Sequence, residues 1–349
     1  MLRGAKAILD RKTGALRSRI SKGSRRELAL KDAEISALRR ELARLGGEQN
    51  VPVPAAGGVP VFFVVGNQKS GTTWLMRMFD AHPEILCKGE GRFFGGSWRQ
   101  KSLKQRDTKR PASSLRYAIL DAEYLRLWIE RSVWSRNDGT GEHLDNLTRM
   151  AIDYFLGGEL LKSGKRIVGD KSPLLTPDTI REISAIYPEA KVIHIIRDGR
   201  DVAVSAAHHA RNFGKGRKHE AEGSAFPDGQ LEKLAAEWAS RVGKTAEDGP
   251  ELLGENYTEV RYEDLLREPG AEIQRLLTFL AVDSTEKTTT RCIEAASFER
   301  LSKGRKRGEE DPSSFFRKGV AGDWKLVFTP GEREIFDREA GDLLARLGY

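Results

Sequence analysis

Cysteine is scarce in this chain. The 349 residues include only two, Cys87 and Cys292, which lie far apart and form no C-x-x-C pair. Two distant cysteines do not build a disulfide framework, so we expect a reduced, cytoplasmic protein. The six histidines show no metal-ligand spacing either. We expect the neighbouring His208 and His209 on a helix surface, and we predict that no metal is required.

Long apolar runs are lacking as well. The longest are Val61–Val65 and Val192–Ile196, whereas a membrane-spanning helix needs about 20 predominantly apolar residues. The amino terminus is basic but has no contiguous apolar stretch of the kind found in a signal peptide. We therefore expect neither a transmembrane helix nor a secretory signal.

An overall basic charge is present, but it is confined to one end. The formal net charge is +8, with 59 Lys and Arg against 51 Asp and Glu. Residues 1–45 hold 13 of the basic and 5 of the acidic residues, which leaves 46 of each sign in the other 304. Because the main body is electrically balanced, we expect no nucleic-acid partner.

The basic end carries a helical stripe. Five apolar residues follow a heptad spacing: Leu28, Ile35, Leu38, Leu42 and Leu45. We predict a basic helical extension over residues 1–45, where the stripe is long enough for only a short coiled coil. A helix packed on the body, a homo-oligomer contact and a peripheral membrane contact all remain open. Glycine and proline then predict a linker over residues 46–59, followed by one domain over 60–349.

Beyond the linker, short β-branched runs alternate with amphipathic helical patterns. The predicted strands are 61–65, 85–87, 166–169, 192–196 and 259–262. The clearest predicted helices are 123–134, 147–161, 178–187, 231–246, 271–280 and 332–347. This alternation favours an α/β fold, a P-loop-like three-layer sandwich with a central, mostly parallel sheet. Polar stretches at 95–111, 212–229 and 302–314 are predicted to be mobile loops.

The first strand runs directly into a loop with the composition of a phosphate-binding site. Residues 61–74 read VFFVVGNQKSGTTW, and we expect the glycines to allow tight turns, so that backbone amides at the following helix start converge on an anion. In a nucleotide-triphosphate loop, GxxxxGK[ST], the lysine follows the second glycine. Here Lys69 precedes Gly71 by two residues, and Thr72 takes the place of that lysine.

Two later segments also carry cations suited to anion binding. Arg197 follows the apolar strand 192–196 at the edge where ligands of parallel sheets bind, and Ser205 lies on the next helix. Arg317 and Lys318 stand beside Gly319, on a loop that ends in Thr329-Pro330-Gly331-Glu332. The last four residues predict a capped helix start.

In this order, the three segments resemble the motifs of sulfotransferases that use 3′-phosphoadenosine 5′-phosphosulfate (PAPS). The resemblance covers about residues 60–330. It implies that the 5′-phosphosulfate loop contacts the cofactor through Gln68, Lys69, Ser70, Gly71, Thr72, Thr73 and Trp74. It implies a 3′-phosphate site made by Arg197, Ser205, Arg317, Lys318 and Gly319. Trp74 and Tyr262 are then expected near the adenine, although both side chains could equally belong to the core. Ser297-Phe298 matches a position bordering the nucleotide only loosely.

The resemblance also suggests the catalytic groups. Sulfuryl transfer requires charge neutralisation at the leaving oxygen, and Lys69 is the cation placed for it. Phenol and steroid sulfotransferases have a histidine base where this chain reads Asp170-Lys171-Ser172-Pro173. Heparan-type enzymes instead use a glutamate two residues before Phe-Phe, together with a lysine. Glu90-Gly91-Arg92-Phe93-Phe94 has that arrangement, so Glu90 is the candidate base and Lys171 a second contact to the sulfonate.

Other interpretations remain for these residues. Glu90 could instead be a loop carboxylate paired with Lys88 or Arg92. His82, in an Ala-His-Pro sequence, is a rival base, which we interpret as structural. The expected acceptor is a small molecule, glycan or glycolipid with a hydroxyl or amine, covered by a lid from the predicted loops. A P-loop kinase or NTPase and a noncatalytic nucleotide-binding scaffold are the alternative functions.

Overall fold

The computed structural model describes residues 58–95, 114–135, 139–213, 226–311, 314 and 316–349. Internal contacts divide the chain into Met1–Val53 and Pro54–Tyr349, and the described residues belong to the second unit. The predicted helical extension and nearly all of the predicted linker lie outside them. The domain boundaries therefore stay a prediction.

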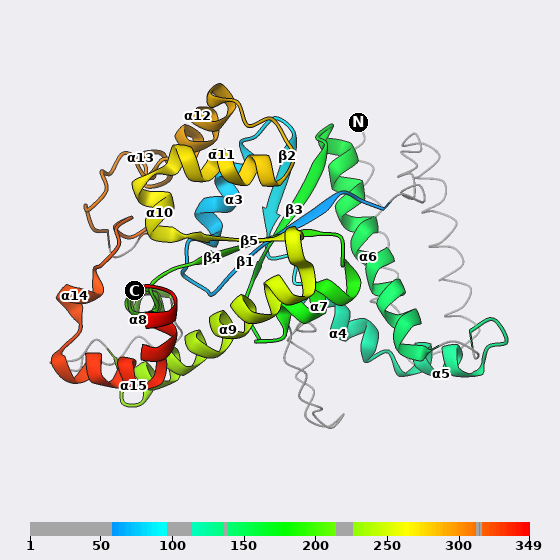
Figure 1. The fold of residues 1–349 in the computed structure, drawn as a ribbon. Helices are drawn as coiled ribbons and strands as arrows, with labels where there is room; N and C mark the ends of the chain where they lie inside the picture. Colours follow the sequence, from blue (N-terminus) through cyan, green and yellow to red (C-terminus); the bar gives the residue numbers. More distant parts are fainter. Residues whose placement is uncertain (1–57, 96–113, 136–138, 214–225, 312–313, 315) are drawn as a thin grey trace, which may run out of the picture. The chain divides into compact units, whose positions relative to one another are not determined.

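Five parallel strands form the centre of the described part (Figure 1). They are β1 (Val61–Gly66), β2 (Ile85–Gly89), β3 (Ile167–Pro173), β4 (Lys191–Ile196) and β5 (Tyr257–Arg261), in the order β2-β3-β1-β4-β5. All five predicted strands are confirmed. The prediction ended the third strand at residue 169, but β3 continues to Pro173 and so includes Lys171.

Helices cover both faces of the sheet, which confirms the predicted α/β fold. Those between the first and fourth strands are α3 (Thr72–Asp80), α4 (Leu115–Leu120), α5 (Glu123–Arg131), α6 (Thr140–Ser163) and α7 (Thr179–Ile186). After β4 come α8 (Gly199–Phe213), α9 (Gln230–Leu253) and the short η2 (Gly254–Asn256). After β5 come α10 (Tyr262–Arg267), α11 (Pro269–Phe279), α12 (Glu286–Ala295), α13 (Phe298–Leu301), α14 (Trp324–Val327) and α15 (Pro330–Arg346).

The alternation of side chains along β1 explains the layers. Phe62 and Val64 belong to a core cluster with residues of α3, α11 and α12, whereas Phe63 and Val65 pack with residues of α7. The two sets lie on opposite faces of the sheet because successive strand residues point to opposite sides. Both sets are buried because helices cover both faces. A further cluster joins α8, α9 and α15. The sheet is therefore buried on both faces, and its strand ends are left to build a site.

Gly66, the last residue of β1, has a different role from the one that we predicted. Its backbone does not adopt a positive φ, so a tight turn is not the reason for a glycine here. A Cβ at this position would lie 2.7 Å from the Ile195 carbonyl oxygen of β4. Gly66 is needed because β1 and β4 approach closely where the loop leaves the sheet.

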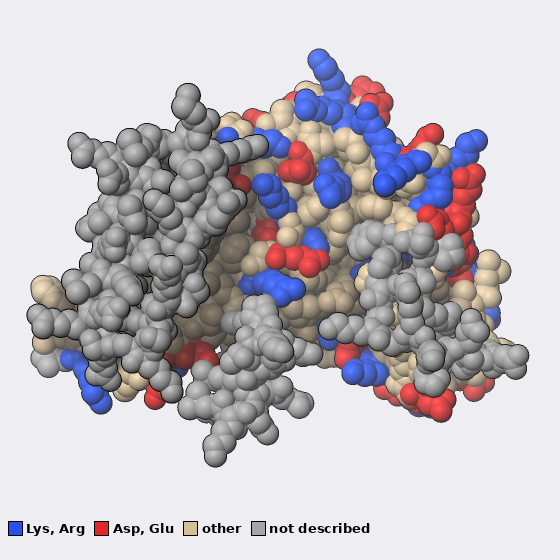
Figure 2. Space-filling model, turned by 180° about the vertical axis from the view of Figure 1, so that it is seen from behind, with Lys and Arg blue, Asp and Glu red and all other residues tan. Residues whose placement is uncertain are grey.

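Charge is mixed over the described surface. On the face shown in Figure 2, Lys and Arg side chains are interspersed with Asp and Glu, as the balanced composition predicts. Among the helices of the described ranges, none is both long and apolar enough to cross a lipid bilayer.

Candidate active site

The carboxyl ends of all five strands contribute to one cavity of about 360 Å³. This volume lies in the usual range of ligand pockets. Of the residues predicted to bind the cofactor or to act in catalysis, the cavity is lined by Gln68, Lys69, Gly71, Thr72, Thr73, Trp74, Glu90, Lys171, Arg197, Ser205, Tyr262, Arg317, Lys318 and Gly319. Ser70 is the one predicted residue that does not line the cavity. Segments that are more than 200 residues apart in the sequence thus meet at one edge of the sheet.

The loop between β1 and α3 contains two residues with a positive φ. Lys69 has φ 72°, and Gly71, the N-cap of α3, has φ 93°. A Cβ on Gly71 would lie 2.6 Å from the ring of Tyr262, so a glycine is required for its conformation and for the space. Ser70 is fully buried, and its hydroxyl has no hydrogen-bond partner among the described residues. Orphaned buried polar groups are rare, and here the group lies within a loop suited to an anion.

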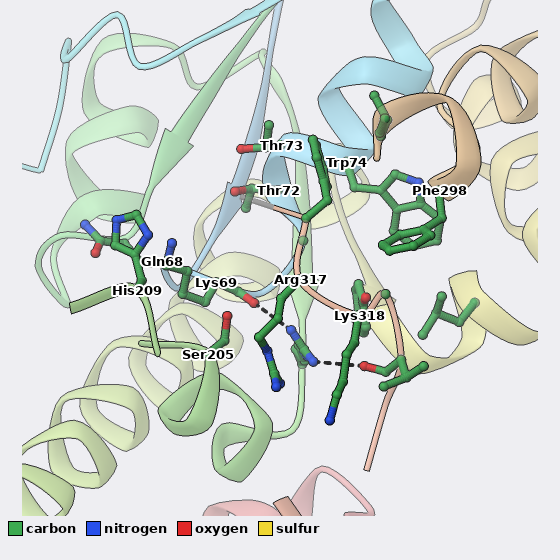
Figure 3. A pocket seen from close by; sticks show the side chains of 18 of the residues that line it. Gln68, Lys69, Thr72, Thr73, Trp74, Ser205, His209, Phe298, Arg317 and Lys318 are labelled. Atoms are coloured by element: carbon green, nitrogen blue, oxygen red, sulfur yellow. Dashed lines mark hydrogen bonds between the residues drawn. The ribbon is translucent and has the colours of Figure 1, made fainter. Parts of the chain in front are cut away.

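Arg197 joins this loop to the loop that carries Arg317 and Lys318, which we call the C-terminal loop (residues 316–323). One guanidinium nitrogen, Nη1, donates to the Lys69 carbonyl and the other, Nη2, to the Val320 carbonyl, each at 3.1 Å (Figure 3). The guanidinium lies 4.4 Å from the centre of the Tyr262 ring, and Nε is buried without a partner in the described structure. Arg197 therefore fixes both loops and still has a donor for a ligand. That donor set fits a phosphate-bearing group.

Asp201 fastens the C-terminal loop to α8. Its carboxylate accepts hydrogen bonds from the backbone amides of Gly322, at 2.6 Å, and Trp324, at 3.0 Å. The same carboxylate lies 3.6 Å from Arg197 Nη2. Asp201 thus holds the C-terminal loop next to Arg197.

Arg317 and Lys318 both pair with carboxylates. Lys318 Nζ lies 3.0 Å from Glu310 and 3.0 Å from Asp323, and Arg317 contacts the same two side chains. Burial acts to lower the pKa of Lys318, but the hydrogen bonds with Asp323 and Glu310 outweigh it and raise that pKa. Both cations therefore keep their charge in the site.

Glu90 and Lys171 form an ion pair at the ends of β2 and β3. Lys171 Nζ donates to Glu90 Oε1 at 2.6 Å, and the Glu90 amide donates to the Lys171 carbonyl at 2.9 Å. The lysine side chain is 5% exposed and that of Glu90 is 56% exposed. A Cβ on Gly89 would lie 2.6 Å from Lys171 Cε, so this glycine makes room for the lysine. Lys88, the partner that we also considered for Glu90, instead lies 3.5 Å from Glu159.

The charges of this cluster act on one another. The hydrogen bond from Lys171 lowers the pKa of Glu90 below its ordinary value, with the charges of Arg92 and Lys69 acting in the same direction. Burial lowers the pKa of Lys69 to about 8, a change that Glu90 opposes and Lys171 reinforces. Perturbed groups that face one another in a cleft are typical of active sites.

The backbone gives a second sign of function at the same place. Five non-glycine residues of the described segments adopt a positive φ, and three of them are Lys69, Glu90 and Arg92. A left-handed conformation of this kind costs on the order of 1 kcal/mol, and such residues cluster at functional sites.

A model of the sulfotransferase family matches residues 60–286. The chain belongs to this family. The predicted family is therefore confirmed by the sequence, on grounds that are independent of the site geometry.

This sulfotransferase is similar to several named proteins. It is 31% identical over 202 residues to sulfotransferase 1A1 of Bos taurus, which covers 52% of this chain and 63% of the bovine protein. It is 27% identical over 235 residues to protein-tyrosine sulfotransferase A of Caenorhabditis elegans, which covers 65% of this chain and 51% of that protein. The matches thus span less than two thirds of these relatives.

Among solved structures, a mouse sulfotransferase complexed with adenosine 3′,5′-bisphosphate (PAP) matches with a TM-score of 0.48 and 18% identity. The match covers 80% of this chain and 82% of the mouse chain. The sulfotransferase domain from the curacin biosynthetic pathway matches with a TM-score of 0.49 and 16% identity, over 84% and 98% of the two chains.

Several residues lining the site of this sulfotransferase escaped the sequence prediction. They are Pro173, His209, Leu266, Leu301, Arg307, Phe316 and Val320, together with Phe298, whose match was loose. We expected His209 on the helix surface, but it lines the same cavity as Gln68 (Figure 3). Its position four residues after Ser205 on α8 could have revealed this, because both then share one helix face. Burial, Lys69 and His208 lower the pKa of His209.

Trp74 and Tyr262 lie both in the core and at the cavity. Each is less than a tenth exposed, and their ring centres are 5.6 Å apart. Trp74 donates to the Ala296 carbonyl at 2.9 Å, and Arg307 lies 5.6 Å from the Trp74 ring. His82, by contrast, is fully buried and does not line the cavity. Its ring nitrogens bond the Asp283 carbonyl and the Glu84 amide, which supports a structural role.

Proposed function

We propose that this sulfotransferase transfers the sulfuryl group of PAPS to a hydroxyl or amine acceptor by in-line displacement. The observation that carries the proposal is the meeting of three anion-binding segments, around Lys69, Arg197 and Arg317, in one cavity. A bisphosphorylated nucleotide bears two separated anionic groups, and each needs its own cations and amides. Membership of the sulfotransferase family supports the same donor.

The residues of this chain divide between the two ends of the cofactor. Lys69, Ser70, Thr72 and Thr73 would hold the 5′-phosphosulfate at the start of α3, where backbone amides and the helix dipole favour anions. Arg197, Ser205, Arg317, Lys318 and Gly319 would hold the 3′-phosphate. Trp74, Phe298 and Tyr262 would border the adenine with aromatic surface. When bound, PAPS supplies an activated sulfuryl group and a phosphate leaving group. We propose that no metal takes part.

In this proposal Glu90 is the general base, and Lys171 orients it and makes a second electrostatic contact to the sulfonate. Glu90 is ionised at neutral pH, since the hydrogen bond from Lys171 lowers its pKa further below the ordinary value, and only one carboxylate oxygen is bound to the lysine. Because more than half of the Glu90 side chain is exposed, the other oxygen can accept the proton of an acceptor hydroxyl or amine. General base catalysis of this kind contributes about 10²- to 10⁴-fold to the rate.

Transfer of labelled sulfonate tests the proposal. Incubation of the protein with ³⁵S-labelled PAPS and cell extract should label an acceptor, and Glu90→Gln should reduce transfer at least about 100-fold while leaving the affinity for adenosine 3′,5′-bisphosphate (PAP) nearly unchanged. Glu159→Gln is the matched control, since Glu159 is an exposed carboxylate paired with Lys162 and Lys88 on the surface. Normal turnover by the Glu90 variant would refute the base. A wild-type protein that labels no acceptor would favour a binding scaffold.

For the acceptor we propose a carbohydrate or lipid-linked hydroxyl or amine. The glutamate base and its lysine resemble the arrangement of heparan-type enzymes rather than the histidine of phenol and steroid enzymes. Fractionating the labelled extract into glycan, lipid, small-molecule and protein pools decides this directly. Label found only in phenols or in tyrosine peptides would contradict the proposed acceptor class.

A further inference from the structure

The cations of the C-terminal loop are already neutralised within the chain. Glu310 spans both of them, with Oε1 2.9 Å from Arg317 Nη1 and Oε2 3.0 Å from Lys318 Nζ. Asp323 contacts the same two cations from its own position. Two positive and two negative side chains therefore face one another at the cavity wall that we assign to a phosphate.

The two carboxylates are held very differently. The side chain of Asp323 is 4% exposed, and the backbone on both sides of it is fixed by the hydrogen bonds of Gly322 and Trp324 to Asp201. The side chain of Glu310 is 36% exposed. In the segments that the structure describes, its carboxylate is bound by Arg317 and Lys318. Asp323 is thus held in place by its surroundings, whereas the more exposed carboxylate of Glu310 is bound through the two cations.

The backbone near Glu310 does not depend on its carboxylate. Arg305 Nη1 donates to the carbonyls of Glu309 and Arg317, at 3.0 and 2.7 Å, and the Gly308 amide donates to the Lys318 carbonyl at 2.9 Å. These bonds keep residues 305–311 alongside residues 316–318. Loss of the Glu310 ion pairs would therefore release the two cations without detaching the loop.

We propose that Glu310 is an internal competitor for the phosphate group that binds Arg317 and Lys318. The carboxylate places two oxygens across the two cations, as a phosphate would, but carries one negative charge. A phosphate monoester carries about 1.5 to 2 charges at pH 7 and three acceptor oxygens, so it can displace the carboxylate. Glu310 holds the two cations in position until the phosphate binds. Because its ion pairs must be broken for the phosphate to bind, Glu310 lowers the affinity for the nucleotide. The inference rests on the proposed function.

Removing the charge of Glu310 should therefore tighten nucleotide binding. Two charge-assisted hydrogen bonds no longer have to be broken, so Glu310→Gln should lower the Kd of PAP about tenfold and slow its dissociation. Adenosine 5′-phosphate lacks the 3′-phosphate and should bind the variant and the wild type equally. This difference separates competition at the phosphate from a general change in the structure.

Glu309→Gln is the matched control. It removes the same charge one residue away, but the Glu309 carboxylate accepts from the Lys306 amide and not from either cation. The experiment is calorimetric titration of the full chain and both variants with PAP and with adenosine 5′-phosphate. Tighter PAP binding by the Glu310 variant alone supports the inference. Equal or weaker PAP binding by that variant, or an equal gain in the Glu309 variant, overturns it. No PAP binding by the wild type would overturn the proposed function as well.

Discussion

Lys69 shows how the surroundings of a single residue change its chemistry. It has a positive φ, lies on the loop that Arg197 binds, and interacts electrostatically with Glu90 and His209. Burial lowers its pKa to about 8, so the ammonium loses its proton just above neutral pH. The charge of Lys69 can therefore be removed at a pH that is lower than an ordinary lysine requires.

The affinity for PAP should therefore fall as the pH rises above 8. The charged form of Lys69 is present below its pKa of about 8 and is lost above it, whereas the phosphates of the ligand, with a second pKa near 6, change their charge little over the same range. Between pH 7 and pH 9 we expect the Kd to rise roughly tenfold. Lys69→Arg should abolish this dependence because arginine stays charged throughout. Calorimetry at both pH values measures it, and an arginine variant with the same loss of affinity would contradict the assignment.

The residues that the sequence revealed were those with a fixed spacing. Lys69, Arg197 and Arg317 could be located because each stands at a set distance from glycines or from a strand end. His209 and Arg307 could not, since their approach to the cavity depends on the phase of α8 and on the path of a loop. The same limit applies to Glu310, whose contact with Arg317 depends on how two loop segments lie side by side.

At the scale of elements, the start of α3 requires a glycine at position 71 for two reasons. Gly71 needs its positive φ, and any Cβ would meet Tyr262. Gly71→Ala should therefore destabilise the protein by at least about 1–2 kcal/mol, the cost of a left-handed alanine, before any clash is added. Urea denaturation followed by circular dichroism measures this.

Gly331→Ala is the control for that substitution. Gly331 lies in the first turn of α15, and a Cβ added there would meet no atom of the described residues within 4 Å. The change should leave stability unchanged or raise it slightly, because alanine favours a helix. Equal stability of the two variants would show that the geometry of the loop is not needed for the fold.

The elements that could be predicted were those with a strong local signal. The apolar runs of β1 and β4 marked buried strands, and Thr329 and Glu332 do form the predicted capping box of α15. α12 was missed because three consecutive threonines give it a poor helical pattern, yet it packs against α3 and α11. The end of β3 was missed because Asp170, Lys171 and Ser172 are polar, although all three are buried.

At the scale of the whole molecule, the parallel sheet explains why the site exists. Parallel strands point their carboxyl ends to one edge, so loops from distant parts of the sequence meet there. Sequence reasoning could predict the sheet and the loops that line the cavity at its edge. It could not identify the individual acceptor, because the predicted lid loops carry no motif that specifies a substrate. Most of two of these loops, residues 96–113 and 214–225, lies outside the described segments.

The central claim is that three distant segments form a single nucleotide site. Titration of the full chain with PAP in the presence of EDTA tests it most directly. We predict one PAP per chain without magnesium, and a Kd at least about tenfold higher for Arg197→Gln, since a charge-assisted hydrogen bond contributes about 1.5–3 kcal/mol. Arg275→Gln, a change on the surface of α11, should leave the Kd unchanged. No binding, binding that requires magnesium, or equal Kd values for the wild type and the Arg197 variant would contradict the account.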